Sequence, residues 1–171
     1  MVVRKHDYYL FNIVNKKSHF LSKEEETSYE MEVCPVGLNY KQLRTYVPIT
    51  TIGDKIVMVG GFYNGYVNLI FLGEDKFNRT FKFPCATITA IQFEPNLQTL
   101  YIGDQDGYLR AYKVKLTVSE IEFAERGVVK AHDGRINDIS PTYKANLLCC
   151  CSEDSTVSLY NLYSCKLTLI Q

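Results

Sequence analysis

The sequence has no tryptophan, no net charge and no long apolar run. The lack of net charge and of apolar runs argues against several classes of protein. Its 171 residues include 19 basic and 19 acidic side chains, so the formal net charge at pH 7 is zero. That balance argues against a nucleic-acid surface or a polybasic membrane patch. No stretch approaches the roughly 18 apolar residues of a membrane span, and the charged start Met1–Asp7 lacks the apolar core of a signal peptide. We therefore expect an intracellular, cytoplasmic protein that reaches membranes only indirectly, through partners.

Recognisable catalytic and metal-binding motifs are also missing. No GxSxG, P-loop or HExxH pattern occurs, and the three histidines are far apart in the sequence. The six cysteines include no CxxC pair. We interpret the run Cys149–Cys151 as small apolar residues of a buried strand, with a metal or redox site as the alternative. We also expect the N-glycosylation sequon Asn78-Arg79-Thr80 to remain unmodified, because an intracellular protein does not meet the glycosylation machinery. We predict no catalytic residue, no cofactor and no metal.

What the sequence does contain is a succession of short strand patterns. Its 13 tyrosines and 9 phenylalanines favour strands. Four alternating or apolar runs, bounded by turn residues, follow one another at Thr87–Phe93, Thr99–Gly103, Tyr108–Val114 and Ser119–Ala124. The pair Asp106-Gly107 is a strong signal for a tight turn between two of them. No segment has a long helical period, so the sequence predicts an all-β chain.

The strand patterns recur at a period that indicates a repeat architecture. A turn of Asn or Asp followed by Gly or Ser begins at Asn64, Asp106 and Asp154, at spacings of 42 and 48 residues. A period of roughly 40–45 residues with four short strands is typical of propeller blades. We predict a partial β-propeller at residues 45–171, with about three four-stranded blades at 45–83, 84–127 and 128–171. Residues 1–44 would form an N-terminal strand segment with a charged loop that could begin a preceding blade.

The last unit resembles a WD repeat. Ala131-His132 stands where that family has Gly-His, and Ser152-Glu153-Asp154 matches its Ser-x-Asp turn. Tyr160-Asn161 stands in the place of the Trp-Asp that closes the third strand. The resemblance implies that the side chains of His132, Ser152 and Asp154 hydrogen-bond within the blade, with Tyr160 at the end of the chain of bonds.

The two earlier units match the WD pattern less fully, but each has a residue at the position of the turn Asp. Asp106 would repeat the role of Asp154, and Asn64 would do so as an amide that tolerates a positive φ. The alternative interpretation of His132 and Asp154 is a general-base pair. Because no motif places a nucleophile beside them, we expect the structural role.

A further stretch, Val59–Leu69, is similar to the start of the WD region that follows the BEACH domain in neurobeachin-like proteins. His132-Asp133 likewise matches the His-Asp of later blades in that family. This resemblance implies a non-catalytic protein-interaction scaffold of vesicle trafficking and membrane fission or fusion. The alternatives are a WD-repeat adaptor of another complex, a truncated gene product without independent function, and an enzyme built on the propeller frame.

The sequence also suggests where partner proteins would bind. Candidate contact loops are Gly73–Phe77 and an insertion at Val114–Lys130, which would account for the longer second spacing. Arg110 and Arg135 are candidate anchors, with a solvated strand face as the alternative. We interpret Ser22–Ser28 as a solvated loop, with an acidic docking site as the alternative.

The end of the predicted last blade leaves a sheet edge open. The final apolar stretch Lys166–Ile170 is expected to form an outer strand. Open edges and uncovered inner strands favour pairing, so we expect further blades or another chain to complete the propeller. We also expect the isolated chain to associate or to dissolve poorly.

Overall fold

The computed structural model shows an all-β chain, as the sequence predicted. It describes residues 2–4, 7–12, 17–20, 43–72, 78–117 and 120–162. The chain divides into two compact units, Met1–Tyr40 and Lys41–Gln171. The first unit contains a three-stranded antiparallel sheet of β1 (Val2–Arg4), β2 (Asp7–Asn12) and β3 (Lys17–Phe20). In the part of the chain that the structure describes, no helix is long and apolar enough to cross a membrane.

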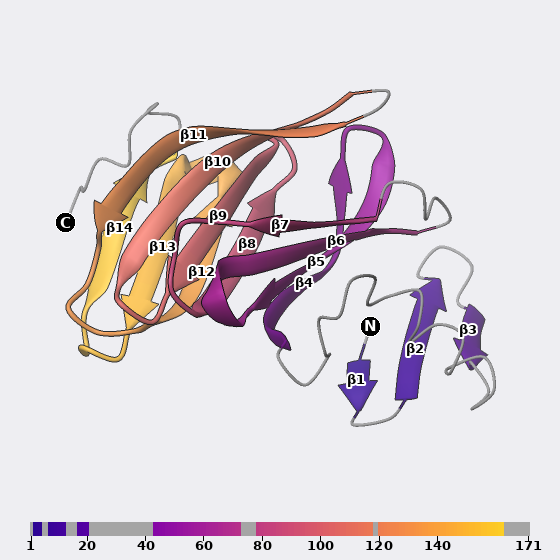
Figure 1. The fold of residues 1–171 in the computed structure, drawn as a ribbon, viewed down its shortest axis with the longest axis horizontal. Coiled ribbons are helices and arrows are strands. Elements are labelled where there is room, and N and C mark those ends of the chain that lie inside the picture. The colour runs from indigo at the N-terminus through magenta and orange to yellow at the C-terminus, as the bar shows by residue number, and fades with distance from the viewer. Residues whose placement is uncertain are drawn as a thin grey trace. The chain divides into compact units, whose positions relative to one another are not determined.

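The second unit consists of three successive antiparallel sheets (Figure 1). Their strand orders are β4-β5-β6-β7, then β11-β10-β9-β8, then β12-β13-β14, so each sheet is a simple meander. The strand bounds are, in chain order, β4 (Leu43–Ile52), β5 (Lys55–Phe62), β6 (Tyr66–Phe71), β7 (Arg79–Lys82), β8 (Ile88–Glu94), β9 (Thr99–Asp104), β10 (Tyr108–Leu116), β11 (Ile121–Lys130), β12 (Ile136–Thr142), β13 (Leu147–Ser152) and β14 (Val157–Asn161). Three predicted segments lie outside the described residues: Ser22–Ser28, Gly73–Phe77 and Lys166–Ile170.

The burial pattern of each strand follows from its position between sheets. The middle sheet packs against both neighbours, and its strand β9 is buried along its whole length. In the third sheet, β13 alternates instead, with Leu148 and Cys150 buried and Cys149 and Cys151 half-buried. A strand that is covered on both faces needs a continuous apolar run, whereas a strand covered on one face needs alternation.

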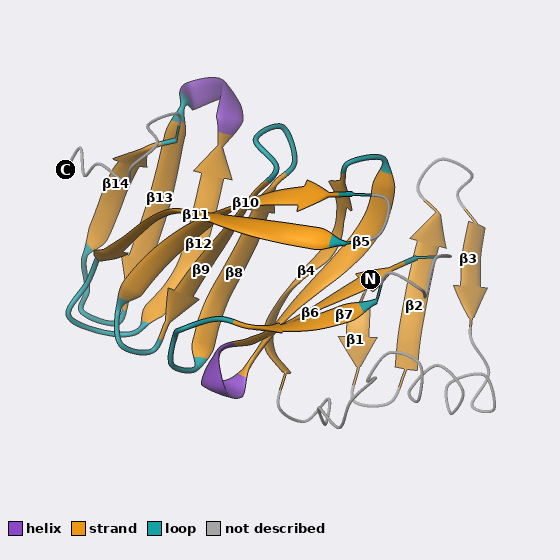
Figure 2. Cartoon of the chain, turned by 45° about the horizontal axis from the view of Figure 1, so that its top comes forward, coloured by secondary structure: helices purple, strands orange, loops and turns teal. Residues whose placement is uncertain are grey.

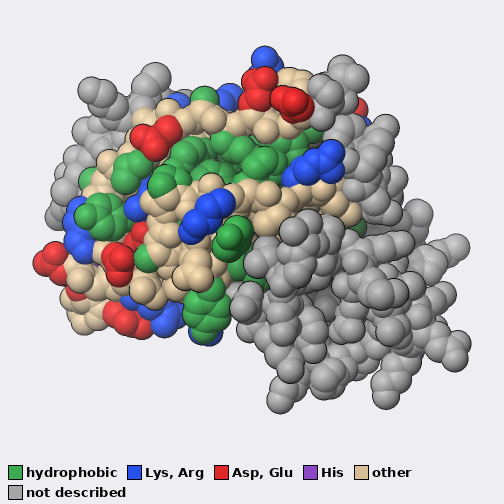
Figure 3. All heavy atoms as spheres, in the orientation of Figure 1, with side chains coloured by type: hydrophobic (Ala, Val, Ile, Leu, Met, Phe, Trp, Pro, Cys, Tyr) green, Lys and Arg blue, Asp and Glu red, His purple; other side chains and the backbone are tan. Residues whose placement is uncertain are grey.

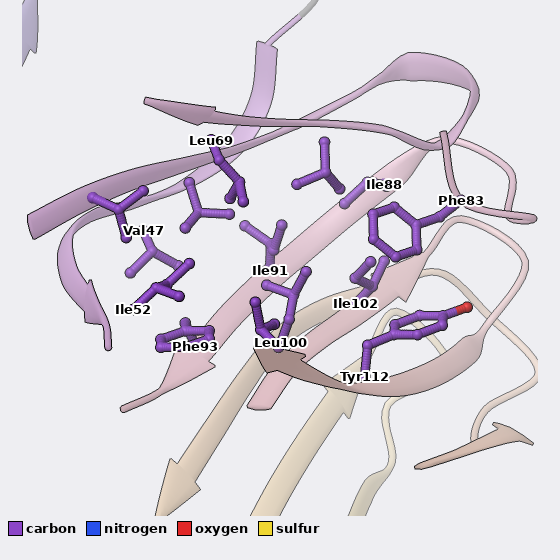
Figure 4. Close-up of a cluster of buried hydrophobic side chains, with 14 of the residues drawn as sticks. Val47, Ile52, Leu69, Phe83, Ile88, Ile91, Phe93, Leu100, Ile102 and Tyr112 are labelled. Atoms are coloured by element: carbon purple, nitrogen blue, oxygen red, sulfur yellow. The ribbon is translucent and has the colours of Figure 1, made fainter. Parts of the chain in front are cut away.

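Two hydrophobic clusters hold the three sheets together. The first lies between the first and second sheets and is shown in Figure 4. Its labelled members are Val47, Ile52, Leu69, Phe83, Ile88, Ile91, Phe93, Leu100, Ile102 and Tyr112. The second cluster joins the second and third sheets and contains Ala90, Tyr101, Leu109, Ala111, Ile136, Ile139, Leu148, Cys150, Tyr160 and Leu162. Complete burial of one such Ile or Phe side chain contributes about 1.5–3 kcal/mol.

A glycine in the second strand of one sheet lets the next sheet approach closely. A Cβ added to Gly61 would lie 2.7 Å from Cγ2 of Ile88, and one added to Gly103 would lie 2.6 Å from Cγ2 of Ile136. Each isoleucine is the first residue of the next sheet's inner strand. By register with the third strand, Cys151 occupies the corresponding position of the third sheet.

The segment Val114–Lys130, predicted as an inserted loop, is mostly paired strand, so the loop conformation is wrong, while its contact with a partner stays a prediction. Strands β10 and β11 pair from Tyr108 with Lys130 to Leu116 with Ile121. The ring of Phe123 in β11 packs at 4.7 Å from that of Phe81 and at 5.1 Å from that of Phe83. Figure 3 shows hydrophobic side chains gathered between this hairpin and β6 and β7. A longer outer pair of strands therefore accounts for the extra length of the second repeat.

Candidate functional site

Five connections lie along one edge of the three sheets, which we call the turn edge (Figure 2). They are the tight turns β5–β6, β9–β10 and β13–β14, and the links β7–β8 and β11–β12 that lead into the next sheet. Backbone hydrogen bonds join the β9–β10 and β13–β14 turns to the link before their own sheets, and the N–H of Phe83 in the β7–β8 link donates to the carbonyl of Gly65 in the β5–β6 turn at 2.9 Å. The N–H of Gln105 donates to the Thr87 carbonyl at 3.0 Å, and the N–H of Glu153 donates to the Arg135 carbonyl at 3.0 Å. The turn edge is therefore a firmly held surface.

His132 is the centre of a buried hydrogen-bond network in the third sheet. The residue is 4% exposed, and it lies in the link between β11 and β12. Its Nδ1 lies 2.8 Å from the Thr156 hydroxyl and 3.2 Å from a carboxylate oxygen of Asp154. Its Nε2 lies 2.9 Å from the Ser158 hydroxyl. Both ring nitrogens are thus occupied within the sheet, as a buried imidazole requires.

Asp154 organises the turn between β13 and β14. Its carboxylate accepts the Thr156 hydroxyl at 2.6 Å and the backbone N–H groups of Thr156 and Asp133, each at 2.9 Å. These bonds, with that of the Thr156 hydroxyl the largest effect, hold the pKa of Asp154 well below its ordinary value. A carboxylate held in this way stays charged and ties the link before β12 to the turn.

Ser152 and Tyr160 lie in the same sheet as His132 and Asp154. The Ser152 hydroxyl donates to the Arg135 carbonyl at 2.8 Å and accepts the N–H of Asp154 at 3.2 Å. Tyr160 is 1% exposed, and burial raises the pKa of its phenol while a hydrogen bond with Ser158 opposes that rise. The structure therefore brings together all four residues that the WD resemblance singled out in this unit. Thr156 and Ser158, which complete the network, were not identified from the sequence.

The second sheet uses a different pair of residues for the same turn. The bonds predicted for Asp106 are made by Asp104, whose carboxylate accepts the N–H groups of Asp106 at 3.0 Å and Tyr108 at 2.9 Å. Its other oxygen is in an ion pair with Arg110. The two side chains are 1% and 9% exposed, so Arg110 is a buried structural residue and the prediction of an exposed anchor there is wrong.

An alignment of the three turns contains the signal for Asp104 and Arg110. Asp104 stands two residues before Asp106, as Ser152 stands before Asp154. Arg110 stands at the position of Ser158, four residues after the turn Asp. An acidic and a basic residue six positions apart across a tight turn are placed to pair, because antiparallel strands bring them to the same end of the sheet.

The remaining predicted residues lie at the turn edge without joining a buried network. Asn64 is exposed and has a φ of 56°, the left-handed conformation expected for its amide. Arg135 is half-exposed and lies 3.3 Å from a carboxylate oxygen of Glu153. A pair exposed to this degree contributes little to stability.

The cysteines of β13 are free thiols, and their chemistry is that of packed side chains. Burial raises the pKa of the Cys150 thiol to about 12 and also raises that of Cys149. A thiol with a raised pKa is a poor nucleophile at neutral pH. No group of three or more His, Cys, Asp or Glu side chains that could hold a metal occurs within the described ranges.

Comparison with known proteins agrees with this geometry. Residues 124–161 match the family model described as WD domain, G-beta repeat, and this stretch contains the whole His132 network. No curated protein sequence matches this chain. A chain in the crystal structure of the Mitotic Checkpoint Complex is similar in fold, with a TM-score of 0.60 and 12% identity. The match covers 97% of this chain and 44% of that chain, so this chain spans less than half of its length.

These comparisons support a family and a general class of function. At 12% identity the structural likeness shows the fold alone, and 533 solved chains match, so the fold by itself selects no single function. The WD-repeat match and the three meander sheets support the WD-repeat family. They also support, in general terms, a protein-interaction scaffold on a partial β-propeller.

Proposed function

We propose that this chain is a non-catalytic protein-interaction module and that a partner protein binds the turn edge. The observation that carries the proposal is the convergence of five connections from three sheets on one edge, where backbone hydrogen bonds hold them. Loops that a rigid scaffold positions are the usual binding elements of a protein. Exposed residues from all three sheets contribute to this edge, among them Pro84, Gln105 and Glu153.

The non-catalytic part of the proposal rests on the His132 network. A general base needs a ring nitrogen that can reach a substrate. Both nitrogens of His132 bond to side chains of its own sheet, and the ring is buried. The arrangement is therefore suited to fixing the turn and not to moving protons.

Site-specific photo-crosslinking tests this proposal. A benzophenone amino acid is placed singly at Pro84, Gln105 and Glu153 of the full chain, produced in its native cell type. Matched controls carry the same group at Asp54, Asn96 and Lys144, which are exposed in the turns β4–β5, β8–β9 and β12–β13 at the opposite edge. We expect a discrete cross-linked protein from the turn-edge positions and none from the controls. Cross-links that arise only from the opposite edge, or equally from both, would contradict the proposal.

A narrower assignment, to a BEACH-type protein of vesicle trafficking, rests on the resemblance of Val59–Leu69. The matching WD model covers residues 124–161 and is common to many WD proteins, so it adds no support for that subgroup. The blade bounds 45–83, 84–127 and 128–171, the cytoplasmic location and completion by further blades or another chain belong to the same proposal. Sequencing the transcript beyond both ends of the reading frame tests the assignment. An upstream BEACH domain in frame would support it, and a different upstream domain would exclude it.

A further inference from the structure

Two sheets carry the same pair of residues at the turn edge. Tyr66 begins β6 and pairs across the ladder with Lys82 at the end of β7, and Tyr108 begins β10 and pairs with Lys130 at the end of β11. In each pair the lysine Nζ lies over the tyrosine ring, at 5.1 Å from the centroid for Lys82 and 5.3 Å for Lys130. These distances are within the range of a cation–π interaction.

A third cation extends this arrangement across the first sheet. The guanidinium of Arg44, near the start of β4, lies 3.9 Å from the ring centroid of Tyr63 in the β5–β6 turn. All three cationic residues are exposed, while Tyr63 and Tyr66 are half-buried. We call the set the cation–tyrosine row; its members are Arg44, Tyr63, Tyr66, Lys82, Tyr108 and Lys130.

The cationic side chains of the row have no acidic partner among the described residues. Among the described residues, no carboxylate lies within salt-bridge distance of Arg44, Lys82 or Lys130, although Lys130 also donates to the Asp106 carbonyl. By contrast, the buried Arg110 is paired with Asp104. Stacking on a ring restricts a flexible cationic side chain, so less conformational entropy is lost when an anion binds it.

The row ends at the third sheet, where the charge changes sign. The position of Tyr66 and Tyr108 is taken there by Thr156, whose hydroxyl is used within the His132 network. The exposed charged side chains of that sheet's turn and link are Asp133, Glu153 and Arg135, and because Arg135 is paired with Glu153 the net charge there is negative. A ligand that follows the whole turn edge therefore meets basic sites on two sheets and acidic sites on the third.

We propose that the cation–tyrosine row binds an acidic peptide segment of a partner protein. Carboxylates of Asp or Glu would pair with Arg44, Lys82 and Lys130, while apolar side chains between them would contact the edges of the tyrosine rings. A nucleic-acid strand fits less well, because the cations already cover the ring faces on which bases stack. Its continuous phosphates would also be repelled at the third sheet. This inference rests on the proposed function, since it names the chemistry of the partner at the same edge.

Surface plasmon resonance on the immobilised full chain tests the inference. The probe is a peptide of about twelve alternating Glu and Leu residues, which spans about 40 Å when extended. The edge variant is Arg44→Gln/Lys82→Gln/Lys130→Gln. The control variant is Lys113→Gln/Lys115→Gln/Lys144→Gln, which removes the same charge from exposed lysines away from the turn edge. Circular dichroism spectra and urea midpoints establish that both variants keep the fold.

We expect the edge variant to weaken binding of the peptide by at least about tenfold, and the control variant to leave it within about twofold. Tyr66→Leu/Tyr108→Leu should also weaken binding, which separates the rings from simple charge attraction. Equal losses in the edge and control variants, or no binding of the peptide, would overturn the inference. Tighter binding of oligouridine than of the peptide would overturn it in favour of a nucleic-acid surface. If the peptide fails while turn-edge cross-links persist, the proposed function stands and only the partner chemistry is wrong.

Discussion

At the scale of single residues, His132 joins the third sheet to its own turn through side-chain bonds on both ring nitrogens. Thr156 and Asp154 lie on its Nδ1 side and Ser158 on its Nε2 side. The second sheet holds its turn with the ion pair of Asp104 and Arg110 instead. The same local problem, a tight turn with buried polar groups, is thus solved by a histidine bonded to hydroxyl groups and a carboxylate in one sheet, and by an arginine–aspartate ion pair in its neighbour.

The substitution His132→Ala is expected to destabilise the protein. The substitution removes the hydrogen bonds of the ring with Ser158 and Thr156 from a buried site, and the loss of two such bonds costs about 1–3 kcal/mol. The free energy of unfolding, measured by urea titration, should fall by that amount. Lys115→Ala, at an exposed position on β10, should change it by less than about 0.5 kcal/mol. An unchanged urea midpoint for His132→Ala would show that the network adds no stability.

The Asp154 carboxylate should make stability depend on acid pH. Its pKa is lowered in the folded chain from an ordinary value of 3.8, first of all by the bond from the Thr156 hydroxyl. A group of this kind stabilises the fold above the pKa of the unfolded chain, and that stability is lost as the pH falls below it. We expect the urea midpoint of the wild type to drop between about pH 5 and pH 3 more steeply than that of Asp154→Asn. Parallel curves for the two proteins would contradict this assignment.

At the scale of elements, the β9–β10 turn is fixed to the link that follows its sheet. The Gly107 carbonyl accepts the N–H groups of Ala131 at 3.0 Å and His132 at 3.2 Å. Gly107 has a φ of 79°, and a Cβ at this position would overlap the carbonyl oxygen of His132. The turn therefore requires glycine both for its backbone conformation and for the close approach of the link.

Comparing Gly107→Ala with Gly53→Ala separates these two requirements. Gly53 also has a positive φ, 62°, but the atom nearest to an added Cβ is Leu116 Cδ2 at 3.9 Å. Gly53→Ala should cost only the left-handed backbone penalty of about 1–2 kcal/mol. Gly107→Ala should cost clearly more, as measured by thermal and urea unfolding. Equal losses would indicate that the link moves away from the turn without cost.

At the scale of the whole molecule, the three sheets repeat one packing contact, with an isoleucine of each following sheet seated on a glycine. Gly61 receives Ile88 and Gly103 receives Ile136. On the third sheet the corresponding Cys151 is half-buried, and nearby Val157 is 60% exposed. The outward side of that sheet is therefore more apolar than an ordinary solvated face.

This outward face leads us to expect that the isolated chain associates in solution. Val157→Lys should raise the monomer fraction, because a lysine on the face opposes burial against another apolar surface. Val128→Lys is the matched control, since Val128 is 44% exposed on the outer strand β11. Light scattering coupled to size-exclusion chromatography measures both. A wild-type chain that is a monodisperse, cooperatively melting monomer would contradict the expectation.

The sequence predicted the elements better than the connections between them. Strands β8, β9 and β10 follow from local alternation and turn residues, which depend on a few neighbouring positions. The error at Val114–Lys130 arose because its length exceeded the repeat period, and length alone does not distinguish a loop from a longer hairpin. Phe123 packs on Phe81 and Phe83, which lie in the preceding sheet and its link, a contact that no local pattern contains.

By itself, the sequence determined the all-β class and the repeated turns, because these depend on residue type and spacing, while its resemblance to a WD repeat pointed to the set of His132, Ser152, Asp154 and Tyr160. Only the tertiary structure decided that Asp104 holds the second turn and that Arg110 is buried. The physical reason is that partners of a polar group are chosen by distance and burial in three dimensions. The cation–tyrosine row depends on the same fact, since each Tyr–Lys pair comes from cross-strand register across a sheet.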